Sequence, residues 1–314
     1  MSADLVTLGE TMALVRATEV GSLEHVTGMR LSVGGAESNV AIAARRLGAS
    51  VAWIGRVGDD GAGRRITREL RAEGVDVHAH VDDGAGTGMM LKSHPSATTT
   101  EVTYGRHMSA GSRLAPDDLP ADVFATARIV HVTGITPALS ASAESAMWDA
   151  LDRADAAHAI VSFDVNYRSR LWRHRDPSTL YRAVTARAGI VFAGLDEARL
   201  VVGDGTPAQV ARRLGELGPA AAIVKLGAEG AVAVIDGAEL WVPAVPVAVV
   251  DTVGAGDGFV GAYLAATLAG APVAERLALA ARVGAAACTG PGDWESYPHA
   301  RDLAHEGPLD PVQR

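Results

Sequence analysis

Residues 251–263 read DTVGAGDGFVGAY, a glycine-rich turn that leads directly into an apolar, helix-forming stretch. Gly254 and Gly256 have no Cβ, so the backbone can turn tightly there and lie close to a ligand. The first N–H groups of a helix have no partner within the helix and favour an anion. The segment therefore predicts an anion-binding turn at the start of a helix.

Asp257 gives this turn its chemistry. A carboxylate among anion-binding amides repels a phosphate unless it accepts a proton, and an attacking hydroxyl is the obvious donor. We expect the amide dipoles at the helix start to keep the pKa of Asp257 low and its carboxylate ionised. The apolar run at residues 245–250 predicts a strand before the turn. The segment indicates phosphoryl transfer, and an ordinary strand-to-helix turn without a catalytic role is the simpler alternative.

Residues 251–257, in the form Asp-Thr-x-Gly-Ala-Gly-Asp, resemble the signature of the ribokinase-like (PfkB) carbohydrate kinases. The resemblance implies an ATP-dependent kinase with a three-layer α/β/α fold, a mostly parallel central sheet and a small β-sheet lid. It also implies that Asp257 is the catalytic base. Gly254 would open the turn, and the backbone N–H groups of Ala255, Gly256 and Asp257 would stabilise the transferring phosphoryl group. Mg²⁺ would arrive bound to ATP.

Composition limits the class of protein. A chain of 314 residues with 48% hydrophobic content can bury a large core in one domain or two. The formal net charge of −9 disfavours nucleic acid and membrane partners, whereas a small anionic substrate needs only a local basic pocket. The single cysteine, Cys288, excludes an internal disulfide, and its Ala-rich surroundings favour a buried filler over a nucleophile. With no secretion signal and no apolar run of the ~18 residues that cross a bilayer, we expect a cytoplasmic protein.

Short β-branched runs alternate with amphipathic stretches, which is the pattern of βαβ units around a mostly parallel sheet. We expect the whole chain, residues 1–314, to form one kinase domain. The predicted strands are residues 4–8, 51–54, 129–132, 159–164, 190–193 and 221–225. The predicted helices are residues 36–47, 61–71, 142–156 and 208–217, followed by the stretches after Gly256 and after Pro272.

Two segments, residues 11–33 and about 87–113, interrupt this alternation and contain no helical pattern. Within the second, residues 98–106 alternate as a strand does, so we expect a small separate sheet. In a kinase such a sheet would form a lid that closes over the substrate and excludes water. A pair of surface hairpins without a gating role is the alternative. The family resemblance further implies a homodimer in which lid strands pair.

A second glycine-rich turn contains Gly34 and Gly35 and again opens a predicted helix. These glycines would let the backbone lie against a ligand. Asn39 in the same turn offers both a donor and an acceptor to hydroxyl groups. On the predicted strand of residues 98–106, Tyr104 and Arg106 share one face. We therefore expect a substrate pocket between this turn and the small sheet.

Arg168 adds a second cationic group to that pocket. It follows a buried-looking strand at the carboxyl end, where open α/β sheets bind ligands. A neutral sugar has little use for two guanidinium groups, whereas Arg106 and Arg168 suit a planar carboxylate. The alternative is that each arginine pairs with a surface Asp or Glu.

Three strings resemble the 2-keto-3-deoxygluconate kinases within the family, namely GGAESNVA at residues 34–41, YGR at 104–106 and DVNYRSRLW at 164–172. The resemblance implies that Arg106, Arg168 and Tyr104 hold the acid end of a keto-deoxy sugar acid. It also implies that Asp293 holds the hydroxyl side. The chain departs from that branch at residues 89–91, where methionine replaces a tyrosine often found in the lid.

A third glycine turn, VKLGAEG at residues 224–230, marks the expected nucleotide side. The family resemblance assigns Gly227 and Gly230 to the ribose and phosphates of ATP. Lys225 is a candidate phosphate contact, with an ordinary surface lysine as the alternative.

Two family asparagines on the nucleotide side are glycines in this chain. The Asn-x-x-Glu motif, which the family links to Mg²⁺ through water, aligns with Gly194 and Glu197. Glu197 is therefore either that magnesium-linked acid or an ordinary acid at a helix start, and no residue is predicted to bind the metal directly. Gly284 stands where an asparagine often lies near the adenine. A K⁺ site near Asp251, known in some relatives, is a further expectation.

The sequence thus predicts ATP-dependent phosphorylation of a primary hydroxyl of a sugar acid, 2-keto-3-deoxygluconate to its 6-phosphate. Fructose, ribose, another neutral sugar or a nucleoside are the alternative acceptors. A non-catalytic sugar-binding relative is the alternative from another class. A dehydrogenase is disfavoured because the first βα turn lacks G-x-G-x-x-G.

Overall fold

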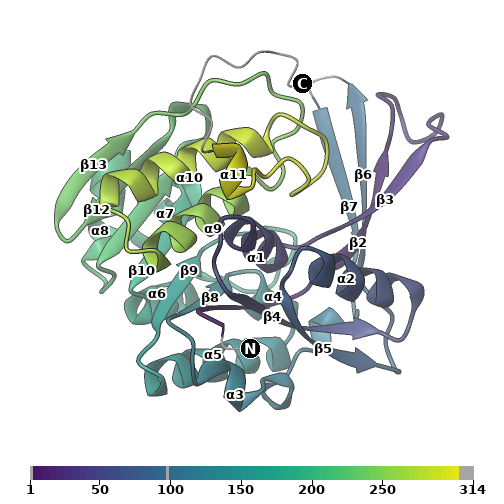
Figure 1. The fold of residues 1–314 in the computed structure, drawn as a ribbon, viewed down its shortest axis with the longest axis horizontal. Coiled ribbons are helices and arrows are strands. Elements are labelled where there is room, and N and C mark those ends of the chain that lie inside the picture. Colours follow the sequence, from purple (N-terminus) through teal and green to yellow (C-terminus); the bar gives the residue numbers. More distant parts are fainter. Residues whose placement is uncertain (1–2, 97–98, 304–314) are drawn as a thin grey trace.

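The computed structural model describes residues 3–96 and 99–303. In this part of the chain the strands form one nine-stranded sheet and one four-stranded sheet (Figure 1). The strand order of the large sheet is β13-β12-β11-β10-β9-β8-β1-β4-β5. Its strands are β1 (Leu5–Leu8), β4 (Val51–Gly58), β5 (Asp76–Asp82), β8 (Ile129–Thr133), β9 (Ile160–Asp164), β10 (Ile190–Gly194), β11 (Ala221–Lys225), β12 (Ala231–Ile235) and β13 (Ala238–Val242).

Parallel pairing runs through the large sheet from β5 to β11, and β12 and β13 complete one edge in antiparallel orientation. The predicted mostly parallel sheet is therefore confirmed. None of the described helices is long and apolar enough to span a membrane. The helices of four or more residues are α1 (Ala36–Arg46), α2 (Gly61–Ala72), α3 (Ala121–Phe124), α4 (Thr136–Leu139), α5 (Ala141–Ala156), α6 (Ser178–Arg187), α7 (Leu195–Val202), α8 (Pro207–Gly215), α9 (Ala255–Leu268), α10 (Val273–Ala287) and α11 (Ala300–Leu303).

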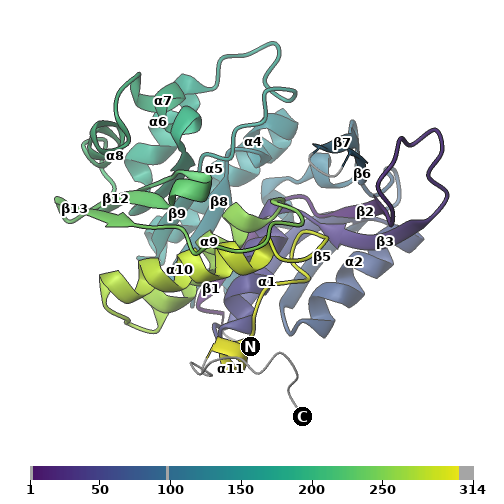
Figure 2. The same cartoon turned by 90° about the horizontal axis from the view of Figure 1, so that it is seen from above.

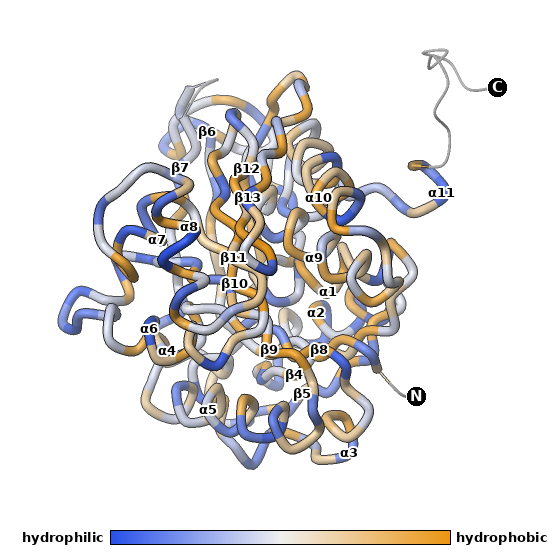
Figure 3. The backbone as a smooth tube through the Cα atoms, turned by 90° about the vertical axis from the view of Figure 1, so that its left-hand side faces the viewer, coloured by the Kyte–Doolittle hydropathy of each residue, from blue (hydrophilic) through white to orange (hydrophobic). Residues whose placement is uncertain are grey.

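Helices cover both faces of the large sheet. Successive strand side chains point to opposite faces, so Leu5 and Trp53 belong to one core and Val6 and Ile54 to the other. Helices α1, α2, α9 and α10 supply the first core, and α3, α5, α6, α7 and α8 supply the second. Apolar residues accordingly follow the strands of the large sheet in Figure 3. The three-layer α/β/α prediction is confirmed.

Helix α9 lies in the middle of its layer and is buried over most of its length. Its neighbour α1 approaches closely at Gly261, where a Cβ would lie 2.6 Å from the Cβ of Ala43 and 2.7 Å from the carbonyl oxygen of Val40. Glycine is therefore required at this crossing. The close packing fixes the amino-terminal end of α9, which carries Asp257.

The four-stranded sheet has the order β3-β2-β6-β7. It projects to one side of the large sheet, as Figure 2 shows from above. The prediction of a small separate sheet from segments 11–33 and 87–113 is confirmed, and Thr98 of the expected strand lies outside the described residues. The four strands are β2 (Met12–Ala17), β3 (Met29–Gly34), β6 (Met89–Ser96) and β7 (Thr99–Gly105).

The predicted strand at residues 245–250 is wrong. The chain has no regular structure between β13 and α9. Pro243 and Pro246 have no N–H to donate to a strand ladder. Val249 and Val250 are 63% and 54% exposed, so the apolar run does not enter the sheet. Instead the run borders the cavity described next.

Candidate active site

A cavity of about 960 Å³ lies between the small sheet and the carboxyl ends of the large-sheet strands. Open α/β sheets bind ligands at this edge. The lining includes nearly all of the predicted site residues, which the sequence scatters over the chain: Gly35, Asn39, Tyr104, Arg106, Arg168, Glu197, Lys225, Gly227, Gly230, Gly254, Ala255, Gly256, Asp257 and Asp293. Gly34 stands just behind this surface, because a Cβ there would lie 2.5 Å from Asp293 Oδ2.

The turn before α9 depends on Gly254. This residue has a left-handed conformation, with φ of 83°, and caps the helix. A Cβ at this position would collide with the carbonyl oxygen of Asp293. The Tyr297 hydroxyl donates to the carbonyl oxygen of Gly254 at 2.6 Å. The amides of Gly256 and Asp257 follow in the first helical turn, where N–H groups have no intrahelical acceptor.

Gly254→Ala is expected to lower kcat by about 10²-fold, since displacing a reacting group by about 1 Å costs that much. Gly270→Ala is the matched control, because Gly270 also has positive φ, at 73°, but a Cβ there would meet no atom within 4 Å. Both variants pay the left-handed backbone cost of about 1–2 kcal/mol. Melting temperature and kcat are measured for both, and equal kcat values would contradict the proposed collision.

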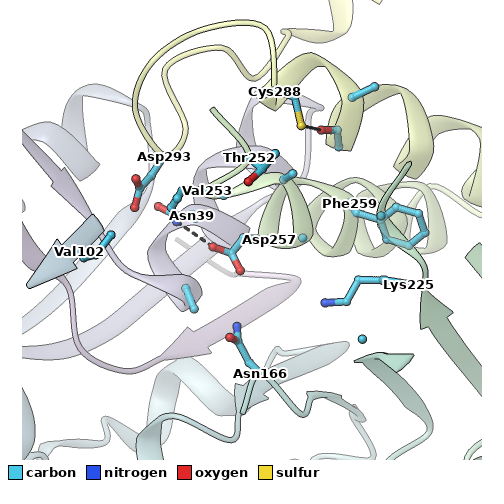
Figure 4. Close-up of a pocket in the computed structure, with 18 of the residues that line it drawn as sticks. Asn39, Val102, Asn166, Lys225, Thr252, Val253, Asp257, Phe259, Cys288 and Asp293 are labelled. Atoms are coloured by element: carbon cyan, nitrogen blue, oxygen red, sulfur yellow. Dashed lines mark hydrogen bonds between the residues drawn. The ribbon is translucent and has the colours of Figure 1, made fainter. Parts of the chain in front are cut away.

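Asp257 points into the cavity from the first turn of α9 (Figure 4). Desolvation raises its pKa to about 7, and the negative charge of Asp164 acts in the same direction. A hydrogen bond of 2.8 Å from Asn39 Nδ2 to Asp257 Oδ2 acts in the opposite direction. The expectation of a low pKa is therefore wrong, because desolvation outweighs the helix start. A carboxylate with a pKa near neutrality suits general base catalysis.

Asn39 is buried beside this carboxylate. Its amide group donates to Asp257, while its buried Oδ1 has no hydrogen-bond partner among the described residues. An unpaired buried acceptor is costly unless a ligand completes it. A hydroxyl group bound here could donate to Asn39 and lie next to Asp257.

Arg106 and Tyr104 face the cavity together from the end of β7. The guanidinium lies 5.7 Å from the centre of the Tyr104 ring. Arg106 Nε and Nη2 contact Glu10 Oε2 at 2.7 and 2.6 Å, and Ser109 also donates to Glu10. The partner of Arg106 is therefore a buried carboxylate rather than a surface acid. A guanidinium has five N–H groups, so further donors remain for a ligand.

Arg168 lines the same cavity but lies at a different part of its wall. Its Nη1 donates to the Tyr167 carbonyl oxygen at 3.1 Å and lies 3.9 Å from Glu197 Oε1. The side chain is 44% exposed. The two predicted arginines thus share one cavity, with Arg106 buried just after β7 and Arg168 exposed beside Glu197.

Lys225 lies across the cavity from Val102 of the small sheet (Figure 4). It is paired with Asp164, whose Oδ2 lies 2.6 Å from the ammonium. A Cβ at Gly256 would lie 3.4 Å from Lys225 Nζ. The ammonium therefore stands over the start of α9. Burial lowers the pKa of Lys225, whereas nearby carboxylates, with Asp164 foremost, raise it. The net shift is upward, so the side chain stays cationic.

Glu197 caps α7. Its two carboxylate oxygens accept the backbone N–H groups of Gly194 at 2.6 Å and Tyr167 at 2.9 Å. Burial raises the pKa of Glu197. Glu197 thus acts as the ordinary helix-start acid that was one of the two alternatives, and it also lines the cavity. Among the described residues no cluster of three or more His, Cys, Asp or Glu side chains could hold a metal ion.

The remaining glycines shape the cavity wall beyond Lys225. Gly227 and Gly230 have φ of 58° and 106° in the turn between β11 and β12. At Gly284 a Cβ would lie 3.2 Å from the Ala255 carbonyl oxygen, so the glycine lets α10 approach the start of α9. Cys288 is half-buried and lines the cavity, with Sγ donating to the Gly284 carbonyl oxygen at 3.4 Å. The prediction that Cys288 is a buried filler is therefore wrong, because the residue is half-buried at the cavity surface.

Glu10, Asn166 and Lys92 are cavity residues to which the sequence interpretation gave no role. Glu10 is the partner of Arg106, and Asn166 takes a left-handed conformation with φ of 39°. Lys92 of β6 is 1% exposed, contacts Asp251 and lies 3.3 Å from Asp293 Oδ1. Burial raises the pKa of Asp293, and the Lys92 ammonium opposes that shift.

Comparison with known proteins agrees with this geometry. The model of the pfkB family carbohydrate kinases matches residues 2–300. The chain belongs to this family. It is an ATP-dependent sugar kinase, and its substrate is a small-molecule sugar.

Individual relatives cover almost the whole chain. The chain is 37% identical to a 2-dehydro-3-deoxygluconokinase of Bacillus subtilis, over 97% of this chain and 95% of the relative. It is 36% identical to a 2-dehydro-3-deoxygalactonokinase of Haloferax volcanii, over 93% of each. A solved structure of a PfkB protein from Polaromonas sp. JS666 superposes with a TM-score of 0.87 at 35% identity, over 96% of this chain and 99% of that chain.

Proposed function

We propose that this kinase phosphorylates the primary hydroxyl of a 2-keto-3-deoxy sugar acid, converting 2-keto-3-deoxygluconate to its 6-phosphate. The observation that carries the proposal is the buried Arg106 guanidinium, which faces the same cavity as Asp257. A guanidinium with free N–H groups binds a carboxylate with charge assistance. The names of the two relatives, both kinases of 2-dehydro-3-deoxy sugar acids, support the same substrate class.

The acceptor would lie with its acid end at the small sheet and its primary hydroxyl at Asp257. Arg106 and Tyr104, with Arg168 from another part of the wall, bind the carboxylate. Gly35 brings backbone to the cavity surface, and Gly34 leaves room for the Asp293 carboxylate behind it. Asn39 and Asp293 bind the hydroxyl groups of the substrate. Asp257 accepts the proton of the attacking hydroxyl, which its pKa of about 7 permits at neutral pH.

The nucleotide would enter from the side of the third glycine turn. Gly227 and Gly230 let the backbone approach ATP, and the Lys225 ammonium faces the phosphates next to Gly256. The backbone N–H groups of Ala255, Gly256 and Asp257 then stabilise the transferring phosphoryl group. Magnesium bound to ATP would neutralise phosphate charge, and Glu197 would reach it only through water.

The small sheet is proposed as a lid within a single kinase domain. Strands β6 and β7 contribute Lys92, Tyr104 and the adjoining Arg106 to the cavity wall, so movement of this sheet would open or close the sugar site. Met29 and Leu31 on β3 and Met89 on β6 are exposed apolar side chains on the same sheet. They support the further proposal that two lids pair in a homodimer.

A coupled ADP-release assay tests the substrate. Purified enzyme is given ATP, Mg²⁺ and one of 2-keto-3-deoxygluconate, fructose, ribose or adenosine. We expect the highest kcat/KM with the sugar acid. A neutral sugar or nucleoside as the best acceptor would overturn the proposal, and failure with every acceptor would favour a non-catalytic relative.

A further inference from the structure

Lysine is rare in this chain, and both copies lie in the cavity. Of the 28 Lys and Arg residues only Lys92 and Lys225 are lysines, and the remainder are arginines. Each lysine pairs with buried aspartate. Lys225 faces the proposed phosphate site, whereas nothing in the proposed catalytic cycle uses Lys92. A compact ammonium on a flexible stem fits where a planar guanidinium does not.

Lys92 lies between two buried carboxylates that come from a different part of the chain. Its ammonium forms an ion pair with Asp251 and lies 3.3 Å from Asp293 Oδ1. All three residues are less than 5% exposed. Removing one member of a buried ionic group leaves uncompensated charge and is strongly unfavourable. The ammonium is therefore the counter-ion that lets both carboxylates lie here.

Both carboxylates support the turn that binds the phosphoryl group. Asp251 Oδ1 accepts the Val253 N–H at 3.1 Å, which closes the turn on itself. The backbone of Asp293 packs so closely against Gly254 that a Cβ on Gly254 would collide with the Asp293 carbonyl oxygen. Lys92 thus joins the two segments that hold Gly254 in its left-handed conformation.

The donor set at Asp251 does not fit the K⁺ ion that the family resemblance suggested. Oδ1 is occupied by the Val253 amide, and Oδ2 contacts the Lys92 ammonium. That ammonium already carries the single positive charge that a monovalent ion would supply. A second cation at this carboxylate would face the ammonium at close range and be repelled.

We propose that Lys92 is a built-in cation, a positioning residue that takes the place of a monovalent ion beneath the phosphoryl-binding turn. This inference rests on the proposed role of that turn. Phosphoryl transfer is accordingly independent of K⁺ and Na⁺. Because Lys92 belongs to β6, the ammonium also ties the small sheet to the turn, so that the turn is correctly held only when β6 is in place.

The first test uses the unmodified enzyme in buffers whose only monovalent cation is tetramethylammonium. We expect kcat and melting temperature to stay unchanged within error when K⁺ or Na⁺ is added. A clear rise of either quantity with K⁺ would overturn the proposal. The melting temperature needs no acceptor, so it reports on the cation even if no acceptor is phosphorylated. Failure of the proposed function and failure of this inference are thereby distinguished.

The second test uses Lys92→Ala, which removes the ammonium together with three carbons of its stem and leaves a space next to two carboxylates. We expect a loss of kcat of about 10²-fold with a smaller change in the KM for ATP, because the turn is displaced rather than the nucleotide site removed. Added K⁺ or methylammonium should restore part of kcat and raise the melting temperature. A folded variant with normal kcat, or one that no cation restores, would contradict the proposal.

Arg64→Ala is the matched control, because Arg64 is a cation in an exposed ion pair with Asp59. It should gain no cation dependence. If Lys92→Ala does not fold without salt, its melting temperature is measured across K⁺ and tetramethylammonium at equal ionic strength. Stabilisation specific to K⁺ supports the proposal, and equal stabilisation by both ions overturns it.

Discussion

Asp257→Asn is expected to lower kcat by about 10²–10⁴-fold, the usual contribution of a general base. The substitution keeps the shape of the side chain, and the amide oxygen can still accept from Asn39. It removes only the ability to take a proton from the attacking hydroxyl. The variant should bind ATP and the acceptor with little change in KM. A folded Asp257→Asn enzyme with near-normal turnover would show that another group is the base.

The raised pKa of Asp257 also predicts how the Asp257→Asn substitution changes stability, which serves as a control for misfolding. Desolvation raises the pKa of Asp257 from 3.8 to about 7, so the folded protein favours the protonated form. The stability from this shift is fully present below about pH 4 and is lost as the pH rises through about 7. Asp257→Asn should therefore melt at least as high as the unmodified enzyme at alkaline pH. A large fall in melting temperature would instead mean that the lost activity reflects misfolding.

The pH dependence of activity follows from the same pKa. The base must be ionised, so log kcat/KM of the unmodified enzyme should rise with unit slope up to about pH 7 and then level off. Steady-state rates across this range test the shape of the curve. A profile that stays flat down to about pH 5 would contradict the raised pKa.

Replacing Arg106 is expected to raise the KM for the sugar acid by about 10–100-fold, the value of a hydrogen bond between charged groups. Arg106→Met removes the guanidinium and keeps much of the aliphatic volume. Because it leaves Glu10 buried without its partner, the substitution is also made together with Glu10→Gln. Arg113→Met is the control, since Arg113 is half-exposed, pairs with the buried Asp82 and does not line the cavity.

The comparison that decides the role of Arg106 is between acceptors. A carboxylate substrate should lose affinity in both Arg106 variants, whereas any residual activity on fructose should keep its KM. Equal losses for the acid and the neutral sugar would mean that Arg106 only maintains the shape of the cavity through Glu10. An unchanged KM for the acid would remove the carboxylate contact from the proposal.

Local patterns predicted the layers of the fold well, because hydrophobic periodicity and helix-capping residues are both read from neighbouring positions in the sequence. The alternation of strand and helix signals gave the parallel sheet, and Gly48 ends α1 with φ of 97° as a helix stop does. The apolar run at residues 245–250 misled the interpretation, since hydrophobicity alone does not show that two prolines remove ladder donors. The antiparallel edge formed by β12 and β13 also had no distinct signal.

Site residues that belong to a sequence motif were predicted. Site residues whose role depends on tertiary contacts were missed. The glycine turns and Asp257 stand in recognisable strings. Glu10 contacts Arg106, which is 96 positions away in the sequence, and Lys92 contacts Asp293, which is 201 positions away. No local spacing in the sequence therefore indicates either residue. The rarity of lysine was the one available signal for Lys92. The pKa of Asp257 was misjudged because desolvation depends on how the small sheet and the large sheet enclose the carboxylate.

Identification of the product tests the central claim most directly. The enzyme is incubated with ATP, Mg²⁺ and 2-keto-3-deoxygluconate, and the product is examined by ³¹P and ¹H NMR. We predict one phosphomonoester whose phosphorus couples to the two protons of the terminal carbon, formed faster than any phosphate ester of fructose or ribose. A phosphate on a secondary hydroxyl, or no ester of the sugar acid while a neutral sugar is phosphorylated, would contradict the account.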